Sequence, residues 1–407
     1  MLMFRRKPKT KACCIAFLGL VLVQSGAALA DSPELDEIMN AAAKAVDEAR
    51  FAEAEQFLRT AISEAEKTSP EDRRLAMALS SLGTVLYSQG KYAESEQAHL
   101  RAVAILERRL GPDHVRVADG LTGLAGLYNM QGRYTEAQPL LERSLSIREK
   151  VLGSAHPDVA NSLNNLGTFY NSQGKFIQAE KFYRRALDIL EQVYGPAHLS
   201  VAGTVSNLGI LYRSAGQVEQ AERFLKRALM IREAWLGTRH PDVAASIGNL
   251  GAFYGSQGKP IEAERLLKQA LRIQEQALGP AHPEVAITLG HLSTVYRGQG
   301  RLDEAEPLIE RSLGIWEQVL GPEHLQVAEA LDSLALTYEA TGKLGRAAPL
   351  RTRSLAILER ARGSNALELS SALDSYATLL MKMSREPEAL QARARARAIR
   401  AEHLGAQ

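Results

Sequence analysis

Apolar residues recur at spacings of three and four through most of the chain, which is the pattern of an amphipathic helix with one buried stripe. Residues 175–194, KFIQAEKFYRRALDILEQVY, show it at Phe176, Ala179, Phe182, Tyr183, Ala186, Leu187 and Ile189. Residues 157–173, PDVANSLNNLGTFYNSQ, show it at Val159, Leu163, Leu166 and Tyr170. Each segment is therefore predicted to form one helix, and Gly174 between them predicts a tight connection.

Glycines divide the chain into units of 42 residues. One set stands at Gly90, Gly132, Gly174, Gly216, Gly258, Gly300 and Gly342, with Ser384 at the next place. A second set with the same interval stands at Gly111, Gly153, Gly195, Gly237, Gly279, Gly321, Gly363 and Gly405. Two glycines in each period predict two helices in each unit, here called helix A (157–173 in the unit above) and helix B (175–194). Small residues such as Gly167 and Ala179 recur where the two backbones are expected to approach closely.

A single unit buries too little apolar surface to offset the entropy lost when it folds. Stacked units share their apolar faces, so the fold class is predicted to be all-α, a right-handed α-solenoid of antiparallel helix pairs. We expect nine pairs. Residues 31–69 are predicted to form a degenerate N-terminal pair, 70–363 the tandem array, and 364–407 a degenerate C-terminal pair.

Residues 1–30 are predicted to be a targeting segment outside this array. Five basic residues lie among the first eleven, an apolar run spans residues 12–23, and Ala28 and Ala30 precede Asp31. These are the three parts of a secretory signal peptide, which predicts an exported protein, periplasmic or secreted, cleaved after Ala30. The alternative is an uncleaved anchor, through which the protein would contact a membrane.

Charge and cysteine content exclude several classes of function. The formal net charge is +2, but five basic residues lie in 1–30, which leaves the remainder mildly acidic and disfavours a nucleic-acid partner. Both cysteines, Cys13 and Cys14, lie in the apolar run, so later residues offer no thiol for catalysis, disulfides or metal binding. No phosphate loop, nucleophile elbow or metal pair at helical spacing is present. We therefore expect no enzyme, no cofactor and no small-molecule substrate.

Several residue types recur once in each unit and are expected to serve the fold. Neighbouring helices lie ~8–10 Å apart, whereas zinc needs ligands at ~2.0–2.1 Å, so equivalent histidines cannot share an ion. We expect packing or capping by His114, His156, His198, His240, His282 and His324. We expect solvated or ion-paired surface at Glu149, Glu191, Glu233, Glu275, Glu317 and Glu359. A solvated cap, rather than a nucleic-acid stripe, is expected at Arg393, Arg395, Arg397 and Arg400, because no aromatic residue lies between them.

The central A helices carry almost no charge, whereas each central B helix carries seven charged residues. Short neutral residues are mediocre helix formers, so a face open to water would gain from Glu or Lys. We infer that the A helices line the inside of the solenoid. The candidate binding groove consists of Asn161, Asn164, Asn165, Asn171, Asn207, Arg213, Asn249, His291 and Arg297. Acidic residues in the last A helices, such as Glu339 and Asp374, suggest a basic stretch in the partner.

Residues 152–189 read LG-x-x-HPDVA-x-SLNNLG-x-x-Y-x-x-QGK-x-x-x-AE-x-x-x-x-RAL-x-I. This pattern resembles the 42-residue tetratricopeptide repeat of the kinesin light chain type, strongly over residues 70–363 and weakly on both flanks. In such proteins, asparagines at this position of helix A contact the backbone of a bound peptide, which implies that role for Asn165, Asn207 and Asn249. The equivalent residues in the outer units depart from asparagine, so the implied role stops at the central units.

The sequence therefore predicts a non-enzymatic scaffold that binds a protein or an extended peptide along its inner groove. One alternative is a structural array that self-associates through its end caps, and another is a membrane-anchored adaptor. A third is that the neutral residues only fill a narrow groove and bind nothing.

Overall fold

The computed structural model describes residues 33–68 and 73–405, over which the chain forms 18 helices and no strand. In chain order they are α1 Pro33–Asp47, α2 Phe51–Thr68, α3 Arg73–Ser88, α4 Tyr92–Leu110, α5 Val115–Met130, α6 Tyr134–Leu152, α7 Pro157–Ser172, α8 Phe176–Tyr194, α9 Leu199–Ser214, α10 Val218–Leu236, α11 Pro241–Ser256, α12 Pro260–Leu278, α13 Pro283–Gly298, α14 Leu302–Leu320, α15 Leu325–Ala340, α16 Leu344–Arg362, α17 Leu367–Lys382 and α18 Glu386–Gly405. Odd numbers are A helices and even numbers are B helices. The nine predicted pairs are confirmed over these ranges, and the expected signal segment 1–30 lies outside them. None of the helices is long and apolar enough to cross a bilayer.

The recurrent histidines begin the A helices. At α7, His156 Nδ1 accepts a hydrogen bond from the backbone N–H of Asp158 at 3.1 Å, and Pro157 occupies the first helical turn. The same bond, to the amide two residues on, is made by His114, His198, His240, His282 and His324. Each therefore satisfies an amide that the helix leaves without a partner, which confirms the expected capping role.

Positive-φ residues end the helices. Gly174, after α7, has φ +73°, and Gly153, after α6, has φ 85° and ψ 152°, a region that only glycine enters readily. Ser384 takes the glycine's place in the last unit and itself adopts φ 59°. Both 42-residue glycine sets, as far as Gly363, are thus explained by backbone conformation at helix ends, whereas Gly405 belongs to α18.

In several units the two helices touch at a glycine of helix A, and other units carry a small residue at the same position, Ala125, Ser293, Ala335 or Ala377. A methyl group at Gly167 would lie 2.6 Å from the ring of Tyr183 on α8, which is closer than real side chains pack. The same clash would occur at Gly209 against Leu225, at 2.7 Å, and at Gly251 against Leu267, at 2.8 Å. Close packing of the two helices therefore requires glycine in these three units and a small residue at the same position elsewhere.

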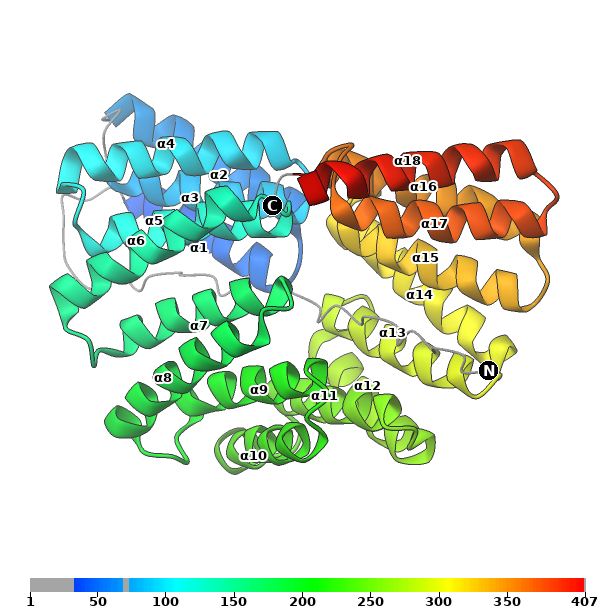
Figure 1. Cartoon of the computed structure of the whole chain (residues 1–407). Coiled ribbons are helices and arrows are strands. Elements are labelled where there is room, and N and C mark those ends of the chain that lie inside the picture. The colour runs from blue at the N-terminus through cyan, green and yellow to red at the C-terminus, as the bar shows by residue number, and fades with distance from the viewer. Residues whose placement is uncertain (1–32, 69–72, 406–407) are drawn as a thin grey trace.

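The A helices form the inner layer and the B helices the outer layer (Figure 1). Consecutive A helices from α3 to α13 pack directly against one another. In the described chain, no two consecutive B helices approach each other as closely. The inner layer is therefore shorter than the outer one, and the array curves toward its A helices.

Ion pairs in regular register connect the B helices on the outside. Arg185 of α8 pairs with Glu149 of α6 at 2.5 Å, and Arg227 of α10 with Glu191 of α8 at 2.5 Å. The same pairing recurs between Arg143 and Glu107, Arg311 and Glu275, Arg353 and Glu317, and Arg395 and Glu359. These contacts confirm the expectation of ion-paired surface for most of the recurrent glutamates and place Arg395 of the last helix in the same ladder. Each exposed pair contributes only ~0–1 kcal/mol.

The curvature closes the solenoid into a ring (Figure 1). The turn between α3 and α4 meets the loop between α14 and α15, where a methyl group at Gly90 would lie 3.5 Å from the Glu323 backbone. The Tyr87 ring lies edge-on to the His324 ring, with centroids 5.8 Å apart. Tyr92 shares an apolar cluster with Leu325. We call the contact formed by Tyr87, Gly90, Tyr92, His324 and Leu325 the clasp.

The clasp buries a histidine side chain whose equivalents in other units are exposed to solvent. His324 is 4% exposed, whereas the side chains of the equivalent His156 and His240 are 41% and 40% exposed. Burial lowers the pKa of His324 to about 4 and raises the pKa of Tyr92 to about 12, so both side chains are neutral at pH 7. The five clasp residues are therefore uncharged at pH 7 and join units that are distant in sequence.

We expect Tyr92→Ala to open the ring, because it removes an aromatic side chain from the clasp. The matched control is Phe176→Ala, at the equivalent repeat position of α8, which lies far from the clasp. Small-angle X-ray scattering should show a larger radius of gyration for Tyr92→Ala than for Phe176→Ala. Equal radii in the two variants and the wild type would contradict a ring held by this contact.

Candidate functional site

Four side chains at one repeat position line the inner face of the central units. They are Asn165 on α7, Asn207 on α9, Asn249 on α11 and His291 on α13, and all four are half-buried. In the described chain, none of the three asparagine side chains hydrogen-bonds to another residue, and His291 Nδ1 is buried without a partner. This row therefore presents unused hydrogen-bonding groups toward the inside of the ring.

The histidine in this row behaves like its asparagine neighbours. Burial, followed by the nearby charge of Arg213, lowers the pKa of His291 to about 4. A neutral imidazole has one N–H donor and one acceptor nitrogen, as an amide side chain has donors and an acceptor. The row is therefore uniformly neutral and can both donate and accept at every unit.

The other predicted asparagines are less available. Asn164 donates to Thr204 Oγ1 at 2.8 Å, which joins α7 to α9, although its Oδ1 is buried without a partner. Asn161 is exposed and lies 3.5 Å from Asp158 Oδ1. Asn171 is half-buried, and its Oδ1 also has no partner. Asn164 thus serves partly to hold α7 and α9 together, and Asn161 lies at the margin of the inner face.

The two predicted arginines, Arg213 on α9 and Arg297 on α13, are half-buried. Burial lowers the pKa of Arg213, and no carboxylate of the described chain forms an ion pair with it. Arg297 donates to the Ser333 carbonyl at 3.1 Å, and burial followed by the charge of Arg351 lowers its pKa. The central inner face therefore carries positive charge with no internal counter-charge.

Sequence reasoning missed a set of glycines on the same face. An added methyl group at Gly203 on α9 or Gly290 on α13 would meet nothing within 4 Å, and at Gly248 on α11 its nearest neighbour would be 3.8 Å away. Packing does not require these glycines, unlike Gly167, and each costs helix stability. Gly203 and Gly290 leave the backbone open to close approach, whereas Gly248 is buried against its neighbours. Their place outside the two 42-residue glycine sets is the signal that could have revealed them.

The acidic residues of the last A helices are already paired within the chain. Glu339 lies 3.0 Å from Arg351 and 3.3 Å from Lys382, and Asp332 lies 3.1 Å from Arg351. Asp374 pairs with Arg400 at 2.7 Å, and Glu368 pairs with Arg362 at 2.8 Å. The expectation of a basic partner segment assumed that these carboxylates are free to bind it. That assumption is wrong, because they form ion pairs within the chain. Counting charges along single helices could not reveal partners on the next helix.

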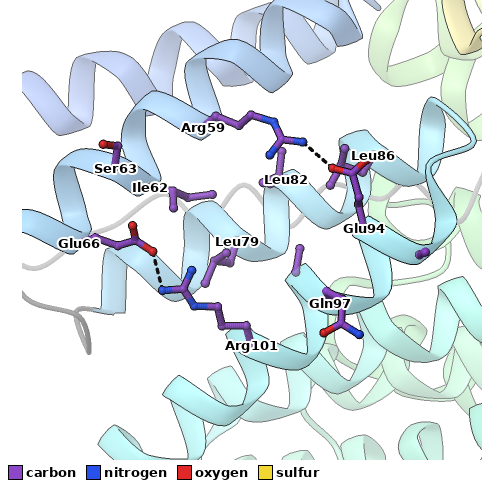
Figure 2. A pocket seen from close by; sticks show the side chains of 12 residues that line it. Arg59, Ile62, Ser63, Glu66, Leu79, Leu82, Leu86, Glu94, Gln97 and Arg101 are labelled. Atoms are coloured by element: carbon purple, nitrogen blue, oxygen red, sulfur yellow. Dashed lines mark hydrogen bonds and ion pairs between the residues drawn. The ribbon is translucent and has the colours of Figure 1, made fainter.

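A separate hollow of about 530 Å³ lies outside the ring between α2 and α4. Its floor is apolar, with Ile62, Leu79 and Leu82. Figure 2 shows Arg59 directed at Glu94 and Arg101 at Glu66 across this hollow, at 2.7 and 2.5 Å. Its charges neutralise one another, so the hollow lacks the unpaired groups of the inner face. In the described parts of the chain, no group of three or more His, Cys, Asp or Glu is arranged to hold a metal ion.

The family profile of the tetratricopeptide repeat matches residues 74–150, 118–192, 158–234, 201–276, 242–313 and 284–360. The chain belongs to the tetratricopeptide repeat family. This confirms the resemblance seen in the repeat motif and the α-solenoid fold. Tetratricopeptide repeat proteins are scaffolds typical of protein–protein interaction and are generally non-catalytic. A search of curated proteins finds no match.

Solved structures resemble this tetratricopeptide repeat protein at low sequence identity. A Rap protein complexed with Competence and Sporulation Factor is 16% identical, with TM-score 0.53, over 93% of this chain and 100% of that chain. Aspartyl phosphate phosphatase F from Bacillus subtilis is 13% identical, with TM-score 0.50, over 92% and 96%. TPR-like repeats of a Podosopora anserina protein described as a kinesin light chain are 28% identical, with TM-score 0.41, over 51% and 97%. The first two likenesses concern the fold alone.

We expect opposite effects from alanine at two helical glycines. Gly290→Ala should raise the free energy of unfolding by up to ~1 kcal/mol, because it improves helix propensity where space is open. Gly167→Ala should lower it by ~1–3 kcal/mol, because the new methyl group overlaps the Tyr183 ring. Urea titration followed by circular dichroism measures both. Destabilisation of similar size in Gly290→Ala would show that packing requires this glycine too.

Proposed function

We propose that this protein is a scaffold that binds an extended segment of another protein along the inner face of α7 to α13. The observation that carries the proposal is the row formed by Asn165, Asn207, Asn249 and His291. In the described chain His291 Nδ1 is buried without a partner, which is costly until one is found, and the three half-buried asparagines add donors and acceptors beside it. A row that can both donate and accept suits a polypeptide backbone, which offers an N–H and a C=O at every residue.

The spacing of the row fits an extended chain. Neighbouring helix axes lie ~8–10 Å apart, and an extended chain advances ~3.3 Å per residue, so one amide meets about every third residue of the guest. Four side chains then span roughly 24–30 Å, which corresponds to a guest segment of about eight or nine residues.

Backbone contacts alone would give little sequence preference. Selectivity would have to come from residues beside the row, of which Arg213 and Arg297 are the charged ones. The Rap protein of similar fold was crystallised with Competence and Sporulation Factor, which supports the capacity of such a fold to hold a partner.

We expect the simultaneous substitution of Asn165, Asn207 and Asn249 by Ala to weaken peptide binding at least tenfold. Each lost hydrogen bond contributes ~0.5–1.5 kcal/mol. The probe is a library of random 12-residue peptides, retained on the immobilised chain and quantified by mass spectrometry.

The matched control replaces three exposed amides that share one repeat position on the outer helices, Gln192, Gln276 and Gln318, by Ala. It should retain peptides as the wild type does. Unchanged retention by the asparagine variant would remove the inner face from the mechanism. Retention of no peptide by the wild type, with concentration-dependent assembly in light scattering, would favour the self-associating array instead.

We further propose that the scaffold works in an exported compartment, on the strength of the basic start, apolar run and small residues within 1–30. Intact-mass measurement of the chain recovered from the exported fraction should give an N-terminus at Asp31. A mass that includes residues 1–30, with the chain recovered in the membrane fraction, would support the anchored alternative.

A further inference from the structure

The helix pair α3 and α4 departs from the repeat at two large residues. One position of helix B is Phe or Leu in each of the following units up to α16, at Leu140, Phe182, Phe224, Leu266, Leu308 and Leu350. One position of helix A is tyrosine in the same units, at Tyr128, Tyr170, Tyr212, Tyr254, Tyr296 and Tyr338. In α4 the first position is Ala98, and in α3 the second is Leu86. This pair therefore lacks two side chains of the size that the repeat normally places there.

The two positions lie against each other in later units. The ring of Tyr170 stacks on the ring of Phe182, with centroids 5.4 Å apart and planes 1° from parallel. The rings of Tyr212 and Phe224 also have centroids 5.4 Å apart. The Tyr212 hydroxyl donates to Glu180 on the preceding B helix at 2.9 Å. These side chains thus occupy the space between successive B helices.

The hollow of about 530 Å³ between α2 and α4 lies where both large side chains are missing. Leu86 and Ala98 both line it. The smaller residues leave space that tyrosine and Leu or Phe fill elsewhere in the array. The hollow is therefore a consequence of two substitutions in one unit, and the side chains that they replace indicate the size and chemistry of what fits.

The rim limits what can enter this hollow. Figure 2 shows Ile62 and Leu79 between the Arg59–Glu94 pair and the Arg101–Glu66 pair. The two pairs are seven residues apart on each helix, which corresponds to ~10 Å along α2 and α4. Each charge at the rim already has a partner. A short neutral group can therefore pass between the pairs, whereas a charged group would have to lose water beside leucine side chains.

We propose that the hollow between α2 and α4 binds a small neutral aromatic molecule, whose ring takes the place of the missing side chains. Sites for small molecules typically have volumes of ~300–1,000 Å³, and an apolar space lined by leucine and isoleucine can take up an aromatic ring. This site lies outside the ring of helices and is independent of the proposed peptide-binding face.

The test is a titration of the full chain with 4-fluorobenzyl alcohol, followed by fluorine nuclear magnetic resonance. A ligand of this size in an apolar site should bind with a dissociation constant on the order of 1 mM. Two charged probes of similar shape, 4-fluorobenzylamine and 4-fluorophenylacetate, should bind at least about fivefold more weakly.

Two variants restore the residues of the other units. Ala98→Leu should weaken binding of the neutral probe at least about tenfold, because the new side chain fills the hollow. Leu86→Tyr should weaken it as well, by placing a ring on the wall of the hollow. The matched control is Ala277→Leu, which adds the same atoms at an exposed alanine of α12 and should leave binding unchanged.

Circular dichroism establishes that each variant is folded, and Leu86→Tyr decides the matter if Ala98→Leu is not. No binding of the neutral probe by the wild type, equal binding of the three probes, or binding that survives the restoring variants would overturn this inference. The triple asparagine variant should bind the probe as the wild type does, so this site and the peptide-binding face can fail separately.

Discussion

The close approach of two helix backbones within each unit is the constraint on which the rest of this structure depends. At Gly167 the neighbouring Tyr183 ring occupies the space of a side chain, and the same holds for Leu225 and Leu267 in the next units. Pairs held at this distance repeat every 42 residues with the A helices packed more tightly against one another than the B helices. A fixed difference between the two layers, repeated from unit to unit, adds up to a ring. The inner face exists because small residues allow that curvature.

The ring separates charges by layer. On the outside, arginines and glutamates of successive B helices neutralise one another in register, so the surface is charged but balanced. On the inside, neutral amides leave hydrogen-bonding capacity unused, and Arg213 leaves one charge unused. Ligand recognition is therefore expected on the inner face, where polar side chains have no partner within the described chain. The number of charged residues on a face does not identify such a site.

Local features of this fold were predictable from the sequence, and contacts between distant units were not. Helix ends followed from histidine caps and positive-φ glycines, since each involves residues only a few positions apart. The clasp was hidden because His324 stands in a loop, GPEH, that differs little from the equivalent loop GPAH ending at His282. Asn164 and Asn165 are adjacent and chemically identical, yet one bonds to Thr204 and the other stays free. The pairing of Glu339 with Arg351 and Lys382 likewise depends on helices that only the fold brings together.

The clasp also restricts how the gene for such an array can change. An open solenoid lengthens or shortens by whole repeats, because each repeat contacts only its neighbours. Here the α3–α4 turn must meet one particular loop, so a duplication or deletion between them would bring the wrong loop to the junction and leave Tyr92 uncovered. Copy number between these two points is therefore constrained. The first helix pair is tied to the closure as well, because Ala45, Phe51 and Leu58 belong to one apolar cluster with residues of α3 and of α13 to α16.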